Sequence, residues 1–102
     1  MTASLQVLYA AGDGIEFDAD YYVSHHIPIV RETIGDFLET LMVTTGIAGP
    51  GGTKPAFHAI ATMTFKDADQ VEAALKALAP AVDDIKRFYN SKPQMVIGTV
   101  VS

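Results

Sequence analysis

The stretch AFHAIATMTF, residues 56–65, decides the fold, because it is the clearest strand of the 102-residue chain. Its side chains alternate between two faces, one with Phe57, Ala59, Ala61, Met63 and Phe65 and the other with His58, Ile60, Thr62 and Thr64. Alternation with a period of two is typical of a β-strand. The pattern therefore predicts a strand whose two faces meet different surroundings.

The chain before this strand predicts a strand, a helix and another strand. Residues 38–47 (LETLMVTTGI) alternate and are rich in β-branched side chains, which favours a strand. Residues 49–55 form a loop of glycine and proline that joins it to the next strand. Residues 5–10 (LQVLYA) predict a short, mostly buried strand that ends at the turn Gly12–Gly14.

Capping residues mark both helices. Asp18 is a good N-cap for a helix that runs to about Ile34 and ends at Gly35. Asp67 caps a second helix, which Pro80 interrupts and whose buried stripe consists of Val71, Ala74, Leu75 and Leu78. An amphipathic turn through Val82, Ile85, Phe88 and Tyr89 and a closing strand over residues 92–101 complete the chain.

This order, β-α-β-β-α-β, predicts a single α+β domain over residues 1–102 with the ferredoxin-like arrangement. Four antiparallel strands would have two helices on one face only. The other face carries Ile60, and the segment MVIGTVV in the last strand is apolar on both faces. Because such a face is poorly suited to water, we expect a homodimer in which two open sheet faces pack together.

The composition narrows the class of function. The net charge is −5 and Lys and Arg form no cluster, which argues against nucleic acid and anionic membrane surfaces as partners. No stretch approaches the ~20 apolar residues of a membrane span. Cysteine is absent, which excludes disulfides and cysteine-based zinc sites. The N-terminus lacks the basic region of a signal peptide, so we expect a cytoplasmic location.

Neither a metal nor another cofactor is expected. His25 and His26 point about 100° apart on a helix, and neither has a histidine or carboxylate four residues away. The sequence contains no G-x-G-x-x-G motif, and the lysine of the loop 49–55 lacks the spacing of a phosphate loop. The glycines of that loop make it a candidate for a mobile lid.

The first helix contains the segment DADYYVSHHIPIV, residues 18–30. On a helical wheel Tyr22, His26 and Thr33 fall on the apolar side, whereas His25 falls on the polar flank. Pro28 has no N–H and therefore cannot donate a hydrogen bond to the carbonyl of Ser24. The helix should therefore kink or loosen near His26, which would open space between the helix and the sheet.

The run FDADYYVSHHIPI, residues 17–29, resembles the signature of the EthD family, which reads roughly F-x-x-Y-Y-x-x-H-H-x-P-L. The resemblance marks Tyr22, His26 and Pro28, and Ile29 stands where leucine is commoner. It implies a dimeric α+β barrel. Relatives of that architecture include cofactor-free monooxygenases of aromatic polyketides, lactone isomerases, polyketide cyclases and dehydratases, and members of the family are often classed as oxidoreductases.

The candidate site residues leave alternatives open. His26 is a candidate general acid/base, because imidazole titrates near a pH of about 6.5, or a core histidine bonded to a backbone carbonyl. Tyr22 is a candidate donor to a ligand oxygen, or it only packs its ring. Tyr9, Thr33, His58 and Tyr89 are candidates for contact with substrate. The sequence does not decide whether His58 faces His26 or the dimer contact.

Three functions remain consistent with these residues. The first is a cofactor-independent oxygenase, isomerase or dehydratase that acts on a small apolar, oxygen-bearing compound, with His26 moving the proton and Tyr22 stabilising charge on oxygen. The second is a ligand-binding or accessory protein of a degradation pathway that uses the same pocket without turnover. The third is a dimeric scaffold in which His26 is structural.

Overall fold

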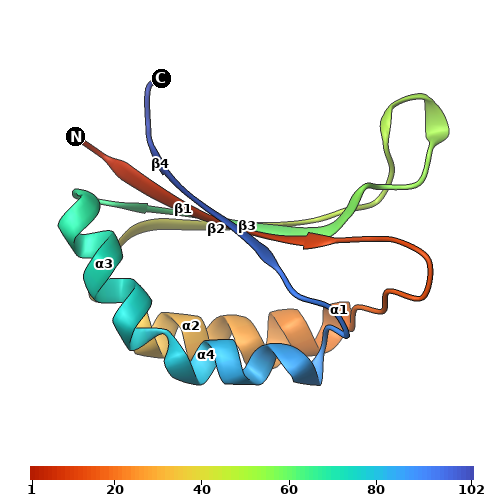
Figure 1. Ribbon diagram of the computed structural model, residues 1–102, viewed down its shortest axis with the longest axis horizontal. Coiled ribbons are helices and arrows are strands. Elements are labelled where there is room, and N and C mark those ends of the chain that lie inside the picture. The colour runs from red at the N-terminus through yellow and green to blue at the C-terminus, as the bar shows by residue number, and fades with distance from the viewer.

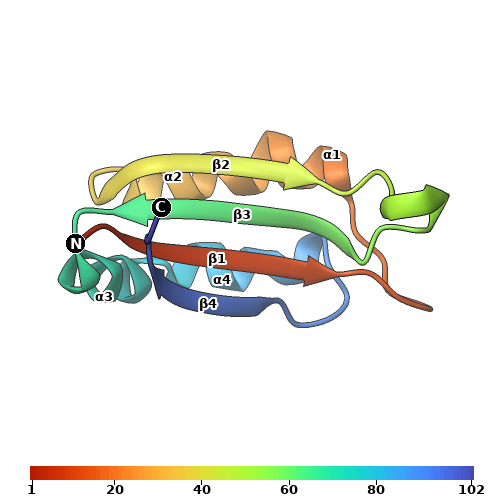
Figure 2. The same ribbon diagram turned by 90° about the horizontal axis from the view of Figure 1, so that it is seen from above.

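The computed structural model describes all residues, Met1–Ser102, as a four-stranded antiparallel sheet with its helices on one face (Figures 1 and 2). The strands are β1 (Ala3–Ala10), β2 (Leu38–Thr45), β3 (Phe57–Phe65) and β4 (Gln94–Thr99). The helices are α1 (Ala19–Tyr21), α2 (Ile27–Ile34), α3 (Ala68–Ala77) and α4 (Ala79–Asp84), with 3-10 turns at Pro50–Gly52 and Ile85–Arg87. The element order confirms the βαββαβ prediction.

The sheet has the strand order β2-β3-β1-β4, and every neighbouring pair is antiparallel. The strand from residue 56 to residue 65 was predicted almost to its ends and pairs with two others. The predicted first strand is longer than expected, because it begins at Ala3, and the predicted last strand is shorter, because it covers only Gln94–Thr99. Figure 2 shows β4 at one edge of the sheet and β2 at the other.

The helices cover the face of the sheet that carries Leu5, Val7 and Tyr9 of β1 and the alternate residues of β3 from Ala59 to Phe65. These side chains belong to a core of 18 buried hydrophobic residues. The opposite face has no layer over it, and Met42 of β2 and Val96 of β4 are 62% and 51% exposed. We expect a second copy of the chain to pack here because this uncovered face is apolar.

Residues 19–34 form one continuous helical segment that widens in its middle. Tyr22–His26 is a π-helical turn in which the N–H of Ile27 donates to the carbonyl of Tyr22, five residues earlier. Pro28 follows in the first turn of α2. Because proline lacks the N–H of a regular α-helical ladder, a local change of hydrogen-bonding register accommodates it. The expected loosening near His26 is thus a π-helical turn and not a break.

Pro80 separates the second helical region into two helices. α3 ends at Ala77 and α4 begins at Ala79, so that Pro80 lies in the first turn of α4. A missing N–H at this position costs little, since the first N–H groups of a helix have no partner within it. Figure 1 shows α4 lying beside α2 under the sheet, which brings two segments far apart in the sequence together. No helix is long and apolar enough to cross a membrane.

Candidate active site beside His26

A small internal cavity of about 30 Å³ lies between the sheet and the helices. Fourteen residues line it, namely Val7, Tyr9, Tyr22, His26, Ile27, Val30, Leu41, Ala61, Met63, Leu78, Ala81, Val82, Ile85 and Met95. All four strands, the π-helical turn, α2, α4, the residue Leu78 between α3 and α4, and the turn after α4 contribute to this wall. Its volume holds about one water molecule, so an organic ligand enters only if side chains of the wall move.

His26 is 3% exposed and is the only basic side chain of this wall. Its Nδ1 lies 3.0 Å from Oδ2 of Asp84, which belongs to α4. Nε2 forms no hydrogen bond with the protein. Because only one ring nitrogen is engaged, the other stays available for a ligand. Of the two roles predicted for this residue, the backbone-bonded core histidine is not observed.

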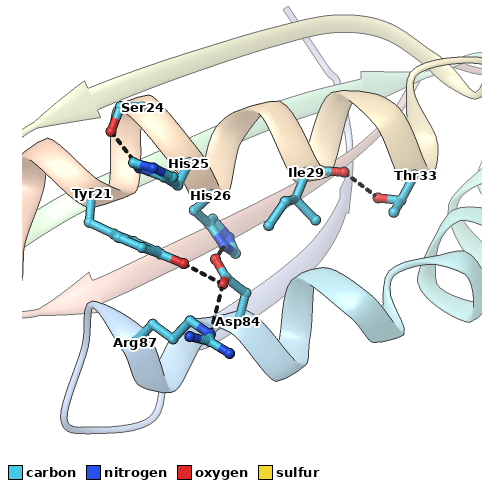
Figure 3. A network of polar contacts seen from close by, with 8 residues as sticks. All are labelled: Tyr21, Ser24, His25, His26, Ile29, Thr33, Asp84 and Arg87. Atoms are coloured by element: carbon cyan, nitrogen blue, oxygen red, sulfur yellow. Dashed lines mark hydrogen bonds and ion pairs between the residues drawn. The ribbon is translucent and has the colours of Figure 1, made fainter.

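Asp84 is 7% exposed and is the centre of a small polar network between the two helices (Figure 3). The hydroxyl of Tyr21 donates to Oδ1 at 2.7 Å, and Nε of Arg87 lies 3.5 Å from the same oxygen. With His26 on the other oxygen, three groups from two separate helical segments converge on one carboxylate. Asp84 therefore holds the His26 ring in one orientation.

The protonation states of His26 and Asp84 follow from their surroundings. Burial alone raises the pKa of Asp84, but the hydrogen bonds from Tyr21 and His26 and the charge of Arg87 outweigh it, so the pKa lies below its usual value. Burial lowers the pKa of His26, and Asp84 offsets this only in part. The resting state is a neutral imidazole beside a carboxylate. The proton of His26 then resides on Nδ1, and the lone pair of Nε2 is free to accept a proton.

Tyr22 supplies the second polar group of the cavity. Its side chain is fully buried, and its hydroxyl has no hydrogen-bond partner. The ring stacks on that of His26, with centroids 5.6 Å apart and planes at 19°. Burial raises the pKa of Tyr22, so the phenol keeps its proton and can donate it in a hydrogen bond. An unpaired buried hydroxyl is costly, with a penalty of about 1–3 kcal/mol, and rare in native proteins.

Tyr9 reaches the cavity from β1 and is 2% exposed. Its ring meets that of Tyr22 edge-on, with centroids 5.3 Å apart. Burial raises the pKa of Tyr9, and the neighbouring phenols of Tyr22 and Tyr89 add to the effect. The cavity thus brings together three of the predicted site residues, which are Tyr9, Tyr22 and His26.

The remaining predicted residues lie outside this cavity. Thr33 donates to the carbonyl of Ile29 at 2.9 Å, and the hydroxyl of Tyr89 donates to that of Ala10 at 2.8 Å, so both hydroxyls have partners in the protein. Tyr89 borders two surface depressions instead. Neither side chain lines the wall around His26.

His58 lies at an irregularity in the sheet. Ala59 pairs with Tyr9 and Phe57 pairs with Ala10, so His58 has no partner on β1. Such a bulge re-aims a side chain, and the His58 ring lies parallel to that of Phe17, with centroids 5.4 Å apart. His58 lines two surface depressions and is not a second base beside His26.

Asp84 is the site residue that the sequence pattern did not reveal. The predicted apolar stripe of this segment included Val82, which is 48% exposed, whereas Asp84 is buried three residues after buried Ala81 and four before buried Phe88. A carboxylate at helical spacing between apolar residues was the available signal. No group of three or more His, Cys, Asp or Glu side chains is placed to hold a metal ion.

The fold and the motif agree with comparisons to known proteins. The family model of the EthD domain matches residues 15–92. An EthD-like protein from Ralstonia eutropha JMP134 is 29% identical, with a TM-score of 0.89 over 99% of this chain and 93% of that chain. No curated protein matches the sequence.

Two more distant structures share the fold alone. A dimeric ferredoxin-like protein of unknown function from Thermobifida fusca is 12% identical, with a TM-score of 0.66 over 98% of this chain and 92% of that chain. A putative monooxygenase from Shewanella loihica is 10% identical, with a TM-score of 0.64 over 99% and 95%. The domain match covers most of the chain and includes the Tyr22–Pro28 motif, so this protein belongs to the EthD family.

Proposed function

We propose that this EthD-family protein is a cofactor-independent enzyme that moves a proton within a small apolar, oxygen-bearing compound such as a lactone, phenol or anthrone. One observation carries the proposal. Nδ1 of His26 is held by Asp84 while Nε2 is free, beside the unpaired hydroxyl of Tyr22. A base and a hydrogen-bond donor converge there on an apolar space.

The proposed step begins at a C–H or O–H bond that a conjugated carbonyl acidifies. Nε2 of His26 takes the proton, and the electron pair of that bond moves onto the carbonyl oxygen. The hydroxyl of Tyr22 donates a hydrogen bond to this oxygen, and the Asp84 carboxylate stabilises the imidazolium that forms. Return of the proton from Nε2 to another atom of the conjugated system completes an isomerisation without any further reactant.

Oxygenation and dehydration can start from the same anion. Oxygenation consumes molecular oxygen, and dehydration expels a hydroxyl group that leaves as water with the proton held by His26. The putative monooxygenase from Shewanella loihica shares only the fold, so the proposal rests on the proton-removal step common to all three reactions.

Exchange of substrate protons with solvent deuterium tests the proposal directly. A panel of small lactones and anthrones is incubated in D2O with the protein, and deuterium uptake at the acidified carbon is followed by NMR. We expect uptake with the natural chain and a loss on the order of 10²–10⁴-fold in His26→Gln. A compound that shifts the His26 resonances without any exchange would support the alternative, a binding protein that uses the same cavity without turnover.

We also infer that two copies pair through the uncovered sheet face. Met42 and Val96 are more than half exposed on this face, as expected for residues that a second copy covers. The ferredoxin-like protein from Thermobifida fusca with the same fold is dimeric. In a homodimer of this kind the second copy would not cover the helical side of the sheet, on which the His26 site lies.

A further inference from the structure

A surface groove of about 700 Å³ runs between α4, the turn that follows it and β4. It shares three wall residues with the internal cavity, namely Val82, Ile85 and Met95. No other surface depression shares a wall residue with that cavity. We call this depression the α4–β4 groove. The shared wall makes this groove a candidate route between solvent and the space beside His26.

The shared wall contains one side chain that can move readily. Met95 is 44% exposed, lies on β4 at the edge of the sheet and is unbranched and flexible. Val82 is 48% exposed, whereas Ile85 is 8% exposed and anchored in the core. Because the cavity holds only about 30 Å³, displacement of Met95 is the least disruptive way to admit a ligand.

The acidic side chains of this helical segment lie away from the α4–β4 groove. Val82, Ile85 and Tyr89 line the groove, whereas Asp83, Asp84 and Arg87 line the depression on the other side, and Lys86 lies between the two and lines both. Positions i, i+3, i+4 and i+7 share one face of a helical segment, which explains this division.

The α4–β4 groove is therefore cationic in an acidic protein. Its lining includes Lys86 and Lys92 but no Asp or Glu, although the chain has 12 acidic and 7 basic residues. Neither lysine takes part in an ion pair, because the two ion pairs of the structure use His26 and Arg87. Two unpaired ammonium groups at the rim of an apolar groove are complementary to an anion attached to an apolar body.

We propose that the α4–β4 groove is the entrance to the internal cavity and binds the anionic end of the substrate. The substrate class is then a small carboxylic acid with an apolar, oxygen-bearing ring. The ring passes Met95 and reaches Tyr22 and His26, while the carboxylate stays with Lys86 and Lys92. This inference rests on the proposed function, since it names the substrate of the same site.

A matched pair of probes tests this inference. 3-(4-Hydroxyphenyl)propanoate and its neutral amide differ only in the charged end. Each is titrated into the natural chain, the double variant Lys86→Gln/Lys92→Gln, and the control Lys76→Gln, which changes an exposed lysine of α3, with the His26 ring and Met95 methyl signals followed by NMR. We expect the acid to bind at least about fivefold more tightly than the amide to the natural chain and the control. In the double variant the ratio should fall to near one.

The outcomes separate this inference from the proposed function. Equal affinities for acid and amide, with both shifting His26, leave the cavity as a binding site but overturn the anionic subsite. A preference that survives in the double variant overturns it as well, because the anion then binds elsewhere. If neither probe shifts His26, the anionic subsite is overturned, whereas the proposed function is still decided by the deuterium exchange of lactones and anthrones.

The role of Met95 has its own test, which needs no lysine variant. Met95→Ala enlarges the passage, so the association rate of the acid, measured by NMR line shapes, should rise severalfold. Met42→Ala, which removes an exposed methionine from the uncovered sheet face, should leave that rate unchanged. A rate that does not respond to Met95→Ala would place the entrance elsewhere.

Discussion

Nδ1 of His26 lies 3.0 Å from the carboxylate of Asp84, although the two residues are 58 positions apart in the chain. One comes from the π-helical turn before α2 and the other from the end of α4. The contact fixes which ring nitrogen carries the proton and leaves Nε2 without a hydrogen bond to the protein. Together with the hydrogen bond from Tyr21 to Asp84, it joins the two helical segments through polar contacts.

Removal of the Asp84 charge should make His26 an ineffective base, although the histidine itself stays in place. In Asp84→Asn the ring of His26 loses the partner that fixes its tautomer, and an imidazolium formed during reaction loses its counter-charge. We expect deuterium uptake to fall on the order of 10²-fold or more. Nitrogen-15 NMR of His26 should show loss of the single tautomer. Asp83→Asn, an exposed neighbour of the same charge, is the control and should leave both measurements unchanged.

Removal of the hydroxyl from Tyr21 and from Tyr22 should change the free energy of unfolding in opposite directions. Tyr22→Phe removes a buried hydroxyl without a partner, so the free energy of unfolding should rise by about 1–2 kcal/mol while ligand affinity and turnover fall. Tyr21→Phe removes the hydrogen bond to Asp84 and should lower the free energy of unfolding. Urea unfolding of both variants provides the measurement. A destabilised Tyr22→Phe protein would mean that its hydroxyl has a partner in solution.

Stability should depend on pH through His26 and Asp84. The pKa of His26 is lowered by burial, so the unfolded chain takes up this proton first as the pH falls. The free energy of unfolding should therefore decline as the pH drops below about 6.5. The pKa of Asp84 is also below its usual value, so its contribution is present above a pH of about 4 and is lost as the pH falls further.

Two histidine variants test whether His26 causes the decline at the higher pH. In His26→Gln the decline that starts near a pH of about 6.5 should flatten, whereas His25→Gln, which alters an exposed histidine, should retain it. The measurement is urea unfolding at intervals of pH. An unchanged slope in His26→Gln would show that other groups dominate this range.

If two copies pair through the uncovered sheet face, the protein should have the mass of a dimer in solution. Light scattering should give twice the mass of one chain, and Met42→Lys on the uncovered sheet face should shift the equilibrium toward single chains. Val23→Lys, which changes an exposed valine in the helical layer, is the matched control. Equal masses for both variants would place the contact on another surface.

Local patterns of the sequence were sufficient for the elements but not for their contacts. Alternation predicted the strand that contains His58, yet the bulge that re-aims this residue depends on pairing with β1. The helical period placed Tyr22 and His26 on the buried side, and both are buried. Asp84 escaped prediction because its partners come from a distant helix, and only the packing of α4 against α2 brings them together.

In the sequence, His26 stands before the loop at Gly51 and Gly52, and Asp84 stands after it. This loop projects away from the body of the molecule (Figure 1). Both glycines are exposed and contribute nothing to the core. A chain divided at this loop would carry His26 on one fragment and Asp84 on the other, and all three strand pairings of the sheet would join the two fragments. Reassociation of the two fragments would restore the contact between His26 and Asp84, and with it the single tautomer of His26. The protein could therefore serve as a split reporter in which the NMR signal of His26 shows that the fragments have bound each other.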